Sequence, residues 1–108
     1  MKESDMVDLD ENGFQSYIEN NRIVLVDFWA RWCMPCIMQG KLLKKNLENI
    51  PDGGKIAKVN VDKNPGVAKR FNVTGIPQMH LFVDGDPVKG WTGLTQTSEI
   101  FREMRKYL

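Results

Sequence analysis

Residues 23–36 read IVLVDFWARWCMPC, an apolar run followed directly by two cysteines that are two residues apart. The first seven residues are nearly all apolar and rich in β-branched side chains, which predicts a central strand buried on both faces. Cys33 and Cys36 are the only two cysteines of the chain. At this spacing they can close a small disulfide or open to a dithiol, so the stretch predicts a two-electron switch at the end of a buried strand.

Strand and helix patterns alternate along the rest of the chain. We expect strands over Met6–Leu9, Ile23–Trp29, Ile56–Asp62, Gln78–Val83 and Val88–Trp91, the last two joined by a hairpin turn at 84–87. We expect helices from Glu11 to Asn20 after an N-cap at Asp10, from Cys33 to about Ile50, from Pro65 to about Phe71 after an N-cap at Asn64, and from a cap at Thr95 or Thr97 to the C-terminus. The order βαβαβ then ββα predicts an α/β fold, with a mixed five-stranded sheet flanked by four helices. The length of 108 residues predicts a single domain, residues 1–108.

Charge and composition exclude several classes of function. The net charge is +1, from 15 basic and 14 acidic residues, so we expect no nucleic-acid partner and no membrane-surface patch. Residues 1–5 are polar and no apolar stretch follows them, so we expect no signal peptide and no transmembrane segment. Two cysteines in such a chain favour a redox or metal role in the cytoplasm over a secreted disulfide framework.

The two cysteines are expected to have different roles. Cys33 at the start of a helix lies beside unpaired amide hydrogens and the positive end of the helix dipole, which favour its thiolate. Pro35 suits the first turn, where a helix needs no N–H group. Cys36 follows one turn later, so the two sulfurs can meet. We therefore expect Cys33 to be an exposed nucleophile and Cys36 a buried resolving thiol, with a reversible Cys33–Cys36 disulfide.

Other readings of these residues are weaker. A zinc site needs two more ligands, but the chain has no third cysteine and its only histidine is His80, so we expect no metal. A purely structural disulfide would close too short a loop to constrain the unfolded chain. We interpret His80 as a packed or edge side chain, and Met34 and Met38 as packing residues in preference to a soft metal site.

Asp27 is the second informative residue, because an aspartate is a poor strand former in a region that should be dry. Burial would raise its pKa and allow it to accept and return a proton near neutral pH. We expect Asp27 to be the proton acceptor for Cys36, directly or through water. The alternative is an aspartate at a frayed strand end. Lys58 is a candidate charge partner, or alternatively a solvated strand lysine.

Several segments together resemble the thioredoxin family. Residues 24–30 and 32–36 resemble its active-site segment, residues 58–65 its third strand and the following helix, and Gly75-Ile76-Pro77 its cis-proline loop. Asp84-Gly85 and Gly93 fall where the family has its hairpin and its last glycine, so the match runs over about residues 6–108. The resemblance implies the thioredoxin fold, with Ile76–Pro77 in the cis form and the Ile76 backbone pairing with an extended substrate. It also implies that Trp32, Ile76, Pro77 and Gly93 surround Cys33 as a docking surface, supported from behind by Asp27, Trp29 and Lys58.

The function implied is reduction of protein disulfides through a mixed-disulfide intermediate, as part of cell redox homeostasis. The implied protein is a monomer without a bound cofactor, since the chain has no flavin or nicotinamide fingerprint, and a separate thioredoxin-reductase-type donor would return its electrons. Two alternatives stay open at this point. One is a protein-disulfide oxidase or isomerase, and the other is an interaction module of the same fold without turnover.

The sequence also departs from the family pattern at four places. Met34 stands where glycine is usual, and Ile37 replaces the usual basic residue after the second cysteine. Gly40-Lys41 occupies the region where the family has a helix-kinking proline, and Gln78 follows Pro77 where threonine is common. These differences predict an atypical member whose reduction potential and partner surface are its own.

Overall fold

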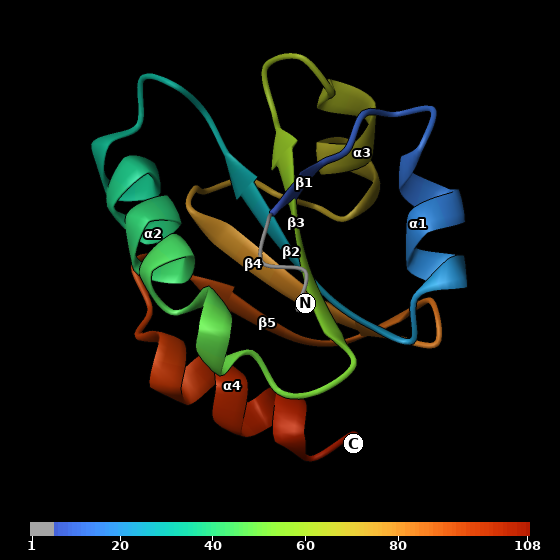
Figure 1. The fold of residues 1–108 in the computed structure, drawn as a ribbon. Coiled ribbons are helices and arrows are strands. Elements are labelled where there is room, and N and C mark those ends of the chain that lie inside the picture. The colour runs from blue at the N-terminus through green and yellow to red at the C-terminus, as the bar shows by residue number, and fades with distance from the viewer. Residues whose placement is uncertain (1–5) are drawn as a thin grey trace.

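A computed structural model describes residues 6–108, so the first five residues of the predicted domain lie outside the described residues. Within that range the chain forms a five-stranded sheet with the strand order β1-β3-β2-β4-β5. The elements, in chain order, are β1 Val7–Asp8, α1 Phe14–Asn20, β2 Ile23–Trp29, α2 Met34–Lys45, a 3-10 turn Leu47–Asn49, β3 Gly54–Asn60, α3 Pro65–Arg70, β4 Gln78–Val83, β5 Asp86–Thr92 and α4 Thr97–Arg105. The predicted α/β architecture and element order are confirmed (Figure 1).

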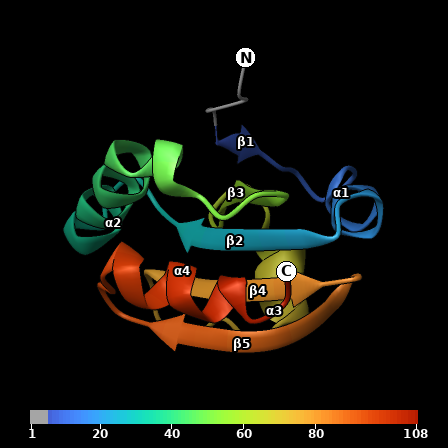
Figure 2. The same cartoon turned by 60° about the horizontal axis from the view of Figure 1, so that its bottom comes forward.

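The sheet is mixed, and β2 is its middle strand. β1, β3 and β2 run parallel to one another, whereas β4 is antiparallel to β2 and β5 is antiparallel to β4. Figure 2 shows the strands one above another in this order, with α4 in front of the sheet and α2 beside the end of β2 at which the active-site loop begins. Because β2 is bonded on both sides, its position fixes where the residues that follow Trp29 leave the sheet.

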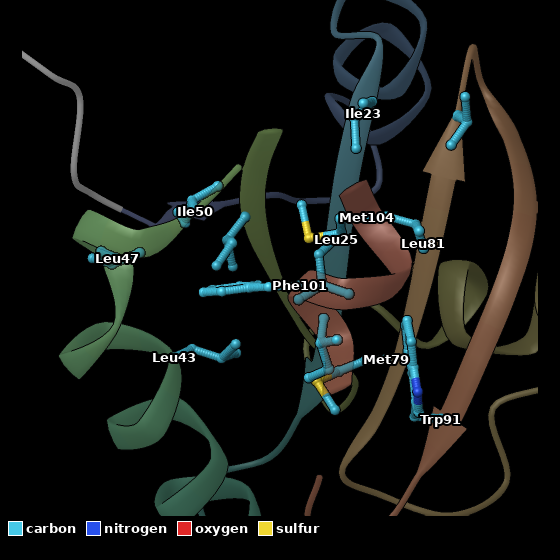
Figure 3. Packing of buried hydrophobic residues seen from close by; sticks show 13 residues of the cluster. Ile23, Leu25, Leu43, Leu47, Ile50, Met79, Leu81, Trp91, Phe101 and Met104 are labelled. Atoms are coloured by element: carbon cyan, nitrogen blue, oxygen red, sulfur yellow. The ribbon is translucent and has the colours of Figure 1, made fainter. Parts of the chain in front are cut away.

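Alternation along β2 divides the core into two layers. Ile23 and Leu25 belong to a cluster with side chains of α2 and α4, and Figure 3 shows Leu25 facing Phe101 and Met104. Val24, Val26 and Phe28 point to the other face and pack with α1 and α3, in a cluster completed by Leu9, Phe14, Ile18, Ala57, Val59, Val67 and Phe82. Successive side chains of a strand point to opposite faces. Asp27, two residues after Leu25, therefore lies on the face covered by α2.

The long helix predicted from Cys33 to Ile50 is wrong at its C-terminal end. α2 stops at Lys45, and the side-chain amide of Asn46 donates a hydrogen bond from Nδ2 to the Leu42 carbonyl at 2.8 Å. Such a local side-chain bond competes with continued helix formation. Leu47 and Ile50 still reach the core, from the 3-10 turn and the residue after it.

Strand boundaries also differ from those expected. β3 ends at Asn60, not Asp62, because the Asn60 side-chain oxygen accepts the amide hydrogens of Asp62 and Lys63 at 2.9 and 3.2 Å. The hairpin turn is shorter than residues 84–87: only Asp84 and Gly85, both with positive φ, separate β4 from β5. Two residues of this kind give the twist that a tight hairpin needs.

The side chains of the predicted helix caps do not all bond to the helix that follows them. The Asp10 side chain accepts the Gly13 amide hydrogen at 2.8 Å, in the turn that leads into α1. Asn64 precedes α3 as expected, but its side-chain oxygen accepts the Glu11 amide hydrogen instead of capping its own helix. Neither threonine caps α4, which begins after Gln96; the Thr95 hydroxyl donates to the Gly93 carbonyl at 2.9 Å.

Candidate active site

The two cysteines lie where β2 passes into α2. Cys33 is the N-cap of α2 and Pro35 stands in its first turn, as predicted. Cys33 and Cys36 form a disulfide in this structure, and the Cys36 amide hydrogen points to Cys33 Sγ, with 3.2 Å between nitrogen and sulfur. The N-terminal amides of a helix favour negative charge, so this position lowers the free energy of a Cys33 thiolate.

The expected exposure of Cys33 is wrong for this disulfide form. Cys33 is 5% exposed and Cys36 is 2% exposed, so the difference between them is small. The cause is packing: the disulfide forms a small cluster with Ala30, against which Trp29, Val61 and Ile76 pack. In the disulfide form, therefore, little of either cysteine is open to solvent.

Asp27 is fully buried inside the sheet and is not at a frayed end. It pairs with Lys58 on β3 and Met79 on β4. Among residues 6–108 neither carboxylate oxygen of Asp27 has a hydrogen-bond partner. Burial raises the pKa of Asp27 from 3.8 to about 7, and the positive charge of Lys58 acts in the opposite direction. The carboxyl can therefore gain or lose a proton near neutral pH.

Lys58 lies beside Asp27 on the neighbouring strand, but its ammonium group lies over the Trp29 ring. Its Nζ sits 4.3 Å from the centroid of the Trp29 ring, a cation–π contact. Lys58 is thus neither a fully solvated lysine nor a direct ion-pair partner; it acts on Asp27 through space. A cavity of about 300 Å³ opens between α2 and the sheet and is lined in part by Trp29, Cys36 and Lys58. This cavity gives solvent a route to Cys36.

The loop before β4 covers one side of the disulfide. The Ile76–Pro77 peptide bond is cis, as the resemblance implied, and Cys33 Sγ lies 3.8 Å from the Ile76 carbonyl oxygen. Gly93 lies next to this loop, since its backbone N–H donates a hydrogen bond to the Pro77 carbonyl at 2.8 Å. Its φ of 88° is one that side chains other than glycine rarely adopt. Trp32 is exposed, and its indole N–H donates to Asp62 at 2.8 Å.

Gln39 is a site-supporting residue that the sequence reasoning missed. It is fully buried, and its amide group makes two hydrogen bonds to the backbone of Thr95: Gln39 Nε2 donates to the carbonyl at 3.0 Å, and Gln39 Oε1 accepts the N–H at 2.8 Å. The signal was available, because Cys36, Gln39 and Leu43 share one face of the helix. A glutamine on a buried face needs polar partners.

The remaining candidates have simpler roles. His80 packs edge-on against Phe28 and Phe71, and burial lowers its pKa, which confirms the interpretation as a packed residue. The interpretation of Met34 and Met38 as packing residues is wrong, since they are 68% and 48% exposed. Among residues 6–108 no group of three or more His, Cys, Asp or Glu side chains is arranged to hold a metal ion.

The fold and the cysteine pair define a class of proteins that exchange dithiols for disulfides, and the comparisons name the family. The family model for thioredoxin matches residues 5–106. A thioredoxin of Alicyclobacillus acidocaldarius is 37% identical over 100 residues, which are 93% of this chain and 95% of that protein. A solved mutant thioredoxin of Halobacterium salinarum superposes with a TM-score of 0.87 at 28% identity, covering 99% of this chain and 95% of the other.

A longer relative has the same similarity over part of its length. The bifunctional thioredoxin reductase/thioredoxin of Mycobacterium leprae is 38% identical over 95 residues, which are 88% of this chain and 21% of that protein. The chain described here belongs to the thioredoxin family. Its family and its disulfide-forming cysteine pair make it a thiol–disulfide oxidoreductase. None of the helices within residues 6–108 is long and apolar enough to cross a membrane.

Replacing Gln39 by leucine tests the two bonds to Thr95. Leucine keeps the apolar volume and removes both hydrogen bonds, which leaves the Thr95 N–H and carbonyl without these partners. We expect the free energy of unfolding to fall by about 1–3 kcal/mol, measured by urea denaturation. A variant as stable as the unchanged protein would show that the loop does not depend on Gln39.

Replacing Asp27 by asparagine tests the cost of the buried carboxyl. Its pKa is about 7 in the folded protein and about 3.8 when unfolded, so folding favours the protonated form. The protein should be most stable, relative to the variant, below pH 3.8, and should lose stability as the pH rises to about 7, because the charged form must then be buried. By linkage the loss is about 4 kcal/mol at most. Urea denaturation of both proteins across pH 4–8 measures it; parallel pH profiles would contradict the raised pKa.

Proposed function

We propose that this protein reduces disulfides of other proteins, through a mixed disulfide on Cys33. The observation that carries the proposal is the Cys33–Cys36 disulfide at the N-terminus of α2, beside the cis Ile76–Pro77 bond. The thioredoxin relatives favour a reductase over an oxidase or isomerase.

The first step is attack by the Cys33 thiolate on one sulfur of a substrate disulfide. A new bond forms between Cys33 and that sulfur, the substrate bond breaks, and the other substrate sulfur leaves with the electron pair. The Cys36 N–H, whose nitrogen lies 3.2 Å from Cys33 Sγ, and the helix N-terminus stabilise the attacking thiolate. Cys33 is assigned as the nucleophile because it is the N-cap, whereas Cys36 lies one turn inside the helix.

The second step releases the substrate and needs a Cys36 thiolate. Asp27 lies on the face of β2 that α2 covers, and with a pKa of about 7 it is suited to accept the Cys36 thiol proton, directly or through water. The Cys36 thiolate then attacks Cys33, the Cys33–Cys36 disulfide closes and the second substrate sulfur leaves as a thiolate. Lys58 is proposed as the charge that limits the rise of the Asp27 pKa.

Substrate docking is proposed at the surface around Cys33. Trp32 is exposed on one side of it, and Ile76, Pro77 and Gly93 stand on the other. The Ile76 backbone would pair with an extended segment of the substrate, as in strand addition to a sheet edge.

Electrons must return from outside this chain. A reductase of the thioredoxin-reductase type is the proposed donor, and the relative in which both activities share one chain supports that pairing. We also propose a monomer, since Cys33, Cys36 and the loop at Ile76 come from one chain. The proposed compartment is the cytoplasm, where thiols are kept reduced.

Replacing Cys36 by serine should trap the first intermediate. Without a resolving thiol, Cys33 stays bonded to the substrate, so a covalent adduct accumulates after mixing with a disulfide-containing protein such as insulin. Mass spectrometry should find the substrate mass on Cys33, and dithiothreitol should release it. The matched Cys33→Ser variant should form no adduct; an adduct on Cys36 of that variant at the same rate would reverse the two roles.

The Asp27→Asn variant should slow the second step and leave the first one nearly unchanged. With 5,5′-dithiobis(2-nitrobenzoate) as substrate, the first thionitrobenzoate appears on attack by Cys33 and the second on attack by Cys36. At pH 7 we expect release of the second to slow by about 10- to 100-fold, since the loss of a general base is offset in part by unaided thiol ionisation. Stopped-flow absorbance separates the two phases. Equal slowing of both phases would assign Asp27 to the reactivity of Cys33 instead.

A further inference from the structure

An apolar groove lies outside the docking surface described above, between α2 and the loop that precedes α4. Its volume is about 380 Å³, and its lining residues are Met38, Lys41, Leu42, Lys45, Leu94 and Gln96. Met38 and Leu94 are each nearly half exposed. Neither side chain belongs to the core clusters, so core packing does not explain them.

The two walls of this groove are held together. Thr95 lies between Leu94 and Gln96, and its backbone N–H and carbonyl are both bonded to Gln39 of α2. Figure 1 shows the chain between β5 and α4 passing alongside α2. The groove is therefore fixed by a buried pair of hydrogen bonds and does not depend on a loose loop.

The groove lies along the helix that begins at Cys33. Met34 and Met38 are one turn apart on the same side of α2, and both are exposed. At 1.5 Å per residue, Met38 lies about 8 Å and Lys45 about 18 Å along the helix from Cys33. An extended peptide spans these lengths with about two to three and five to six residues.

Positive charge lines the far part of the groove. Lys41 and Lys45 both contribute to it, and none of its six lining residues is acidic. The helix dipole favours a lysine in the last turn of α2, which accounts for Lys45, but Lys41 lies one turn earlier. A partner that fills the groove would therefore place an apolar side chain near Met38 and Leu94, and an acidic one near the lysines.

We propose that this groove is a substrate subsite, which selects disulfides of proteins that carry an apolar side chain close to the reacting cysteine and an acidic side chain further away. The inference rests on the proposed function and names its substrate class. Cys33 performs the same exchange on every disulfide, and the groove changes the rate at which a given partner docks.

The test uses two synthetic peptides, each with one cysteine capped as a mixed disulfide with thionitrobenzoate. One peptide has leucine two and three residues from the cysteine and aspartate five and six residues from it, on both sides. The other has serine and asparagine at those positions. Attack by pre-reduced protein on the peptide sulfur releases thionitrobenzoate, so stopped-flow absorbance gives a second-order rate constant for each. We expect the leucine–aspartate peptide to react about three- to tenfold faster at low salt, and this preference to shrink in 1 M salt.

Two neighbouring lysines give a matched pair of variants. Lys44 and Lys45 are both exposed in the last turn of α2, but Lys44 does not line the groove. Glutamate at either position changes the net charge and the dipole interaction equally. Lys45→Glu should abolish or reverse the preference for the acidic peptide, whereas Lys44→Glu should keep most of it. Met38→Gln should reduce the preference for the leucine-containing peptide, because it removes apolar surface from the groove.

The outcomes separate this inference from the proposed function. Equal rates for the two peptides, or equal effects of Lys44→Glu and Lys45→Glu, would overturn the subsite while reduction of the generic disulfide continued. Failure to reduce any disulfide would overturn the proposed function itself. Equal peptide rates together with a dimer, found by sedimentation and dissociated by Lys45→Glu, would overturn the subsite and assign the groove to a second copy of the chain.

Discussion

The pairing of β2 with strands on both sides is the constraint on which the rest of the molecule depends. Its register with β3 and β4 places alternate side chains in two separate core layers. The same alternation directs Asp27 toward α2 and starts the active loop at Trp29. A shift by one residue would move every side chain of the strand to the opposite face. The hydrophobic layers thus position the redox pair and the carboxyl together.

At Asp27 the chemistry of the candidate site and the stability of the fold favour different environments for the carboxyl. The surrounding side chains exclude water, and this gives its carboxyl a pKa of about 7, near neutral pH. The cost is a buried carboxyl that has no hydrogen-bond partner within the described residues 6–108. The positive charge of Lys58 lowers the free-energy cost of ionising Asp27. It does so without forming an ion pair, because the charge lies over the Trp29 ring. A fully paired carboxylate would make a more stable protein and a poorer proton acceptor.

Sequence reasoning found the features that depend on local pattern and missed those that depend on distant partners. Element order, the disulfide pair and buried Asp27 follow from runs of residues, and the cis bond at Pro77 follows from the resemblance. The ends of α2 and β3 were misplaced because side chains of Asn46 and Asn60 bond to nearby backbone. The role of Gln39 depends on Thr95, 56 residues away. The low exposure of Cys33 likewise depends on packing with Ile76, which no local pattern records.

The shape of β5 has a consequence for self-association. β5 and β1 are the two outer strands, and unpaired outer strands invite edge-to-edge aggregation. β1 is only two residues long, while β5 contains Pro87, which has no N–H to offer, and the ladder between β4 and β5 is irregular at Leu81 and Phe82. The proposed docking of extended chains at Ile76 requires that the outer strands of the sheet do not bind such chains as well. Outer strands that are short or irregular would let the protein bind partly unfolded partners without forming extended sheets with them.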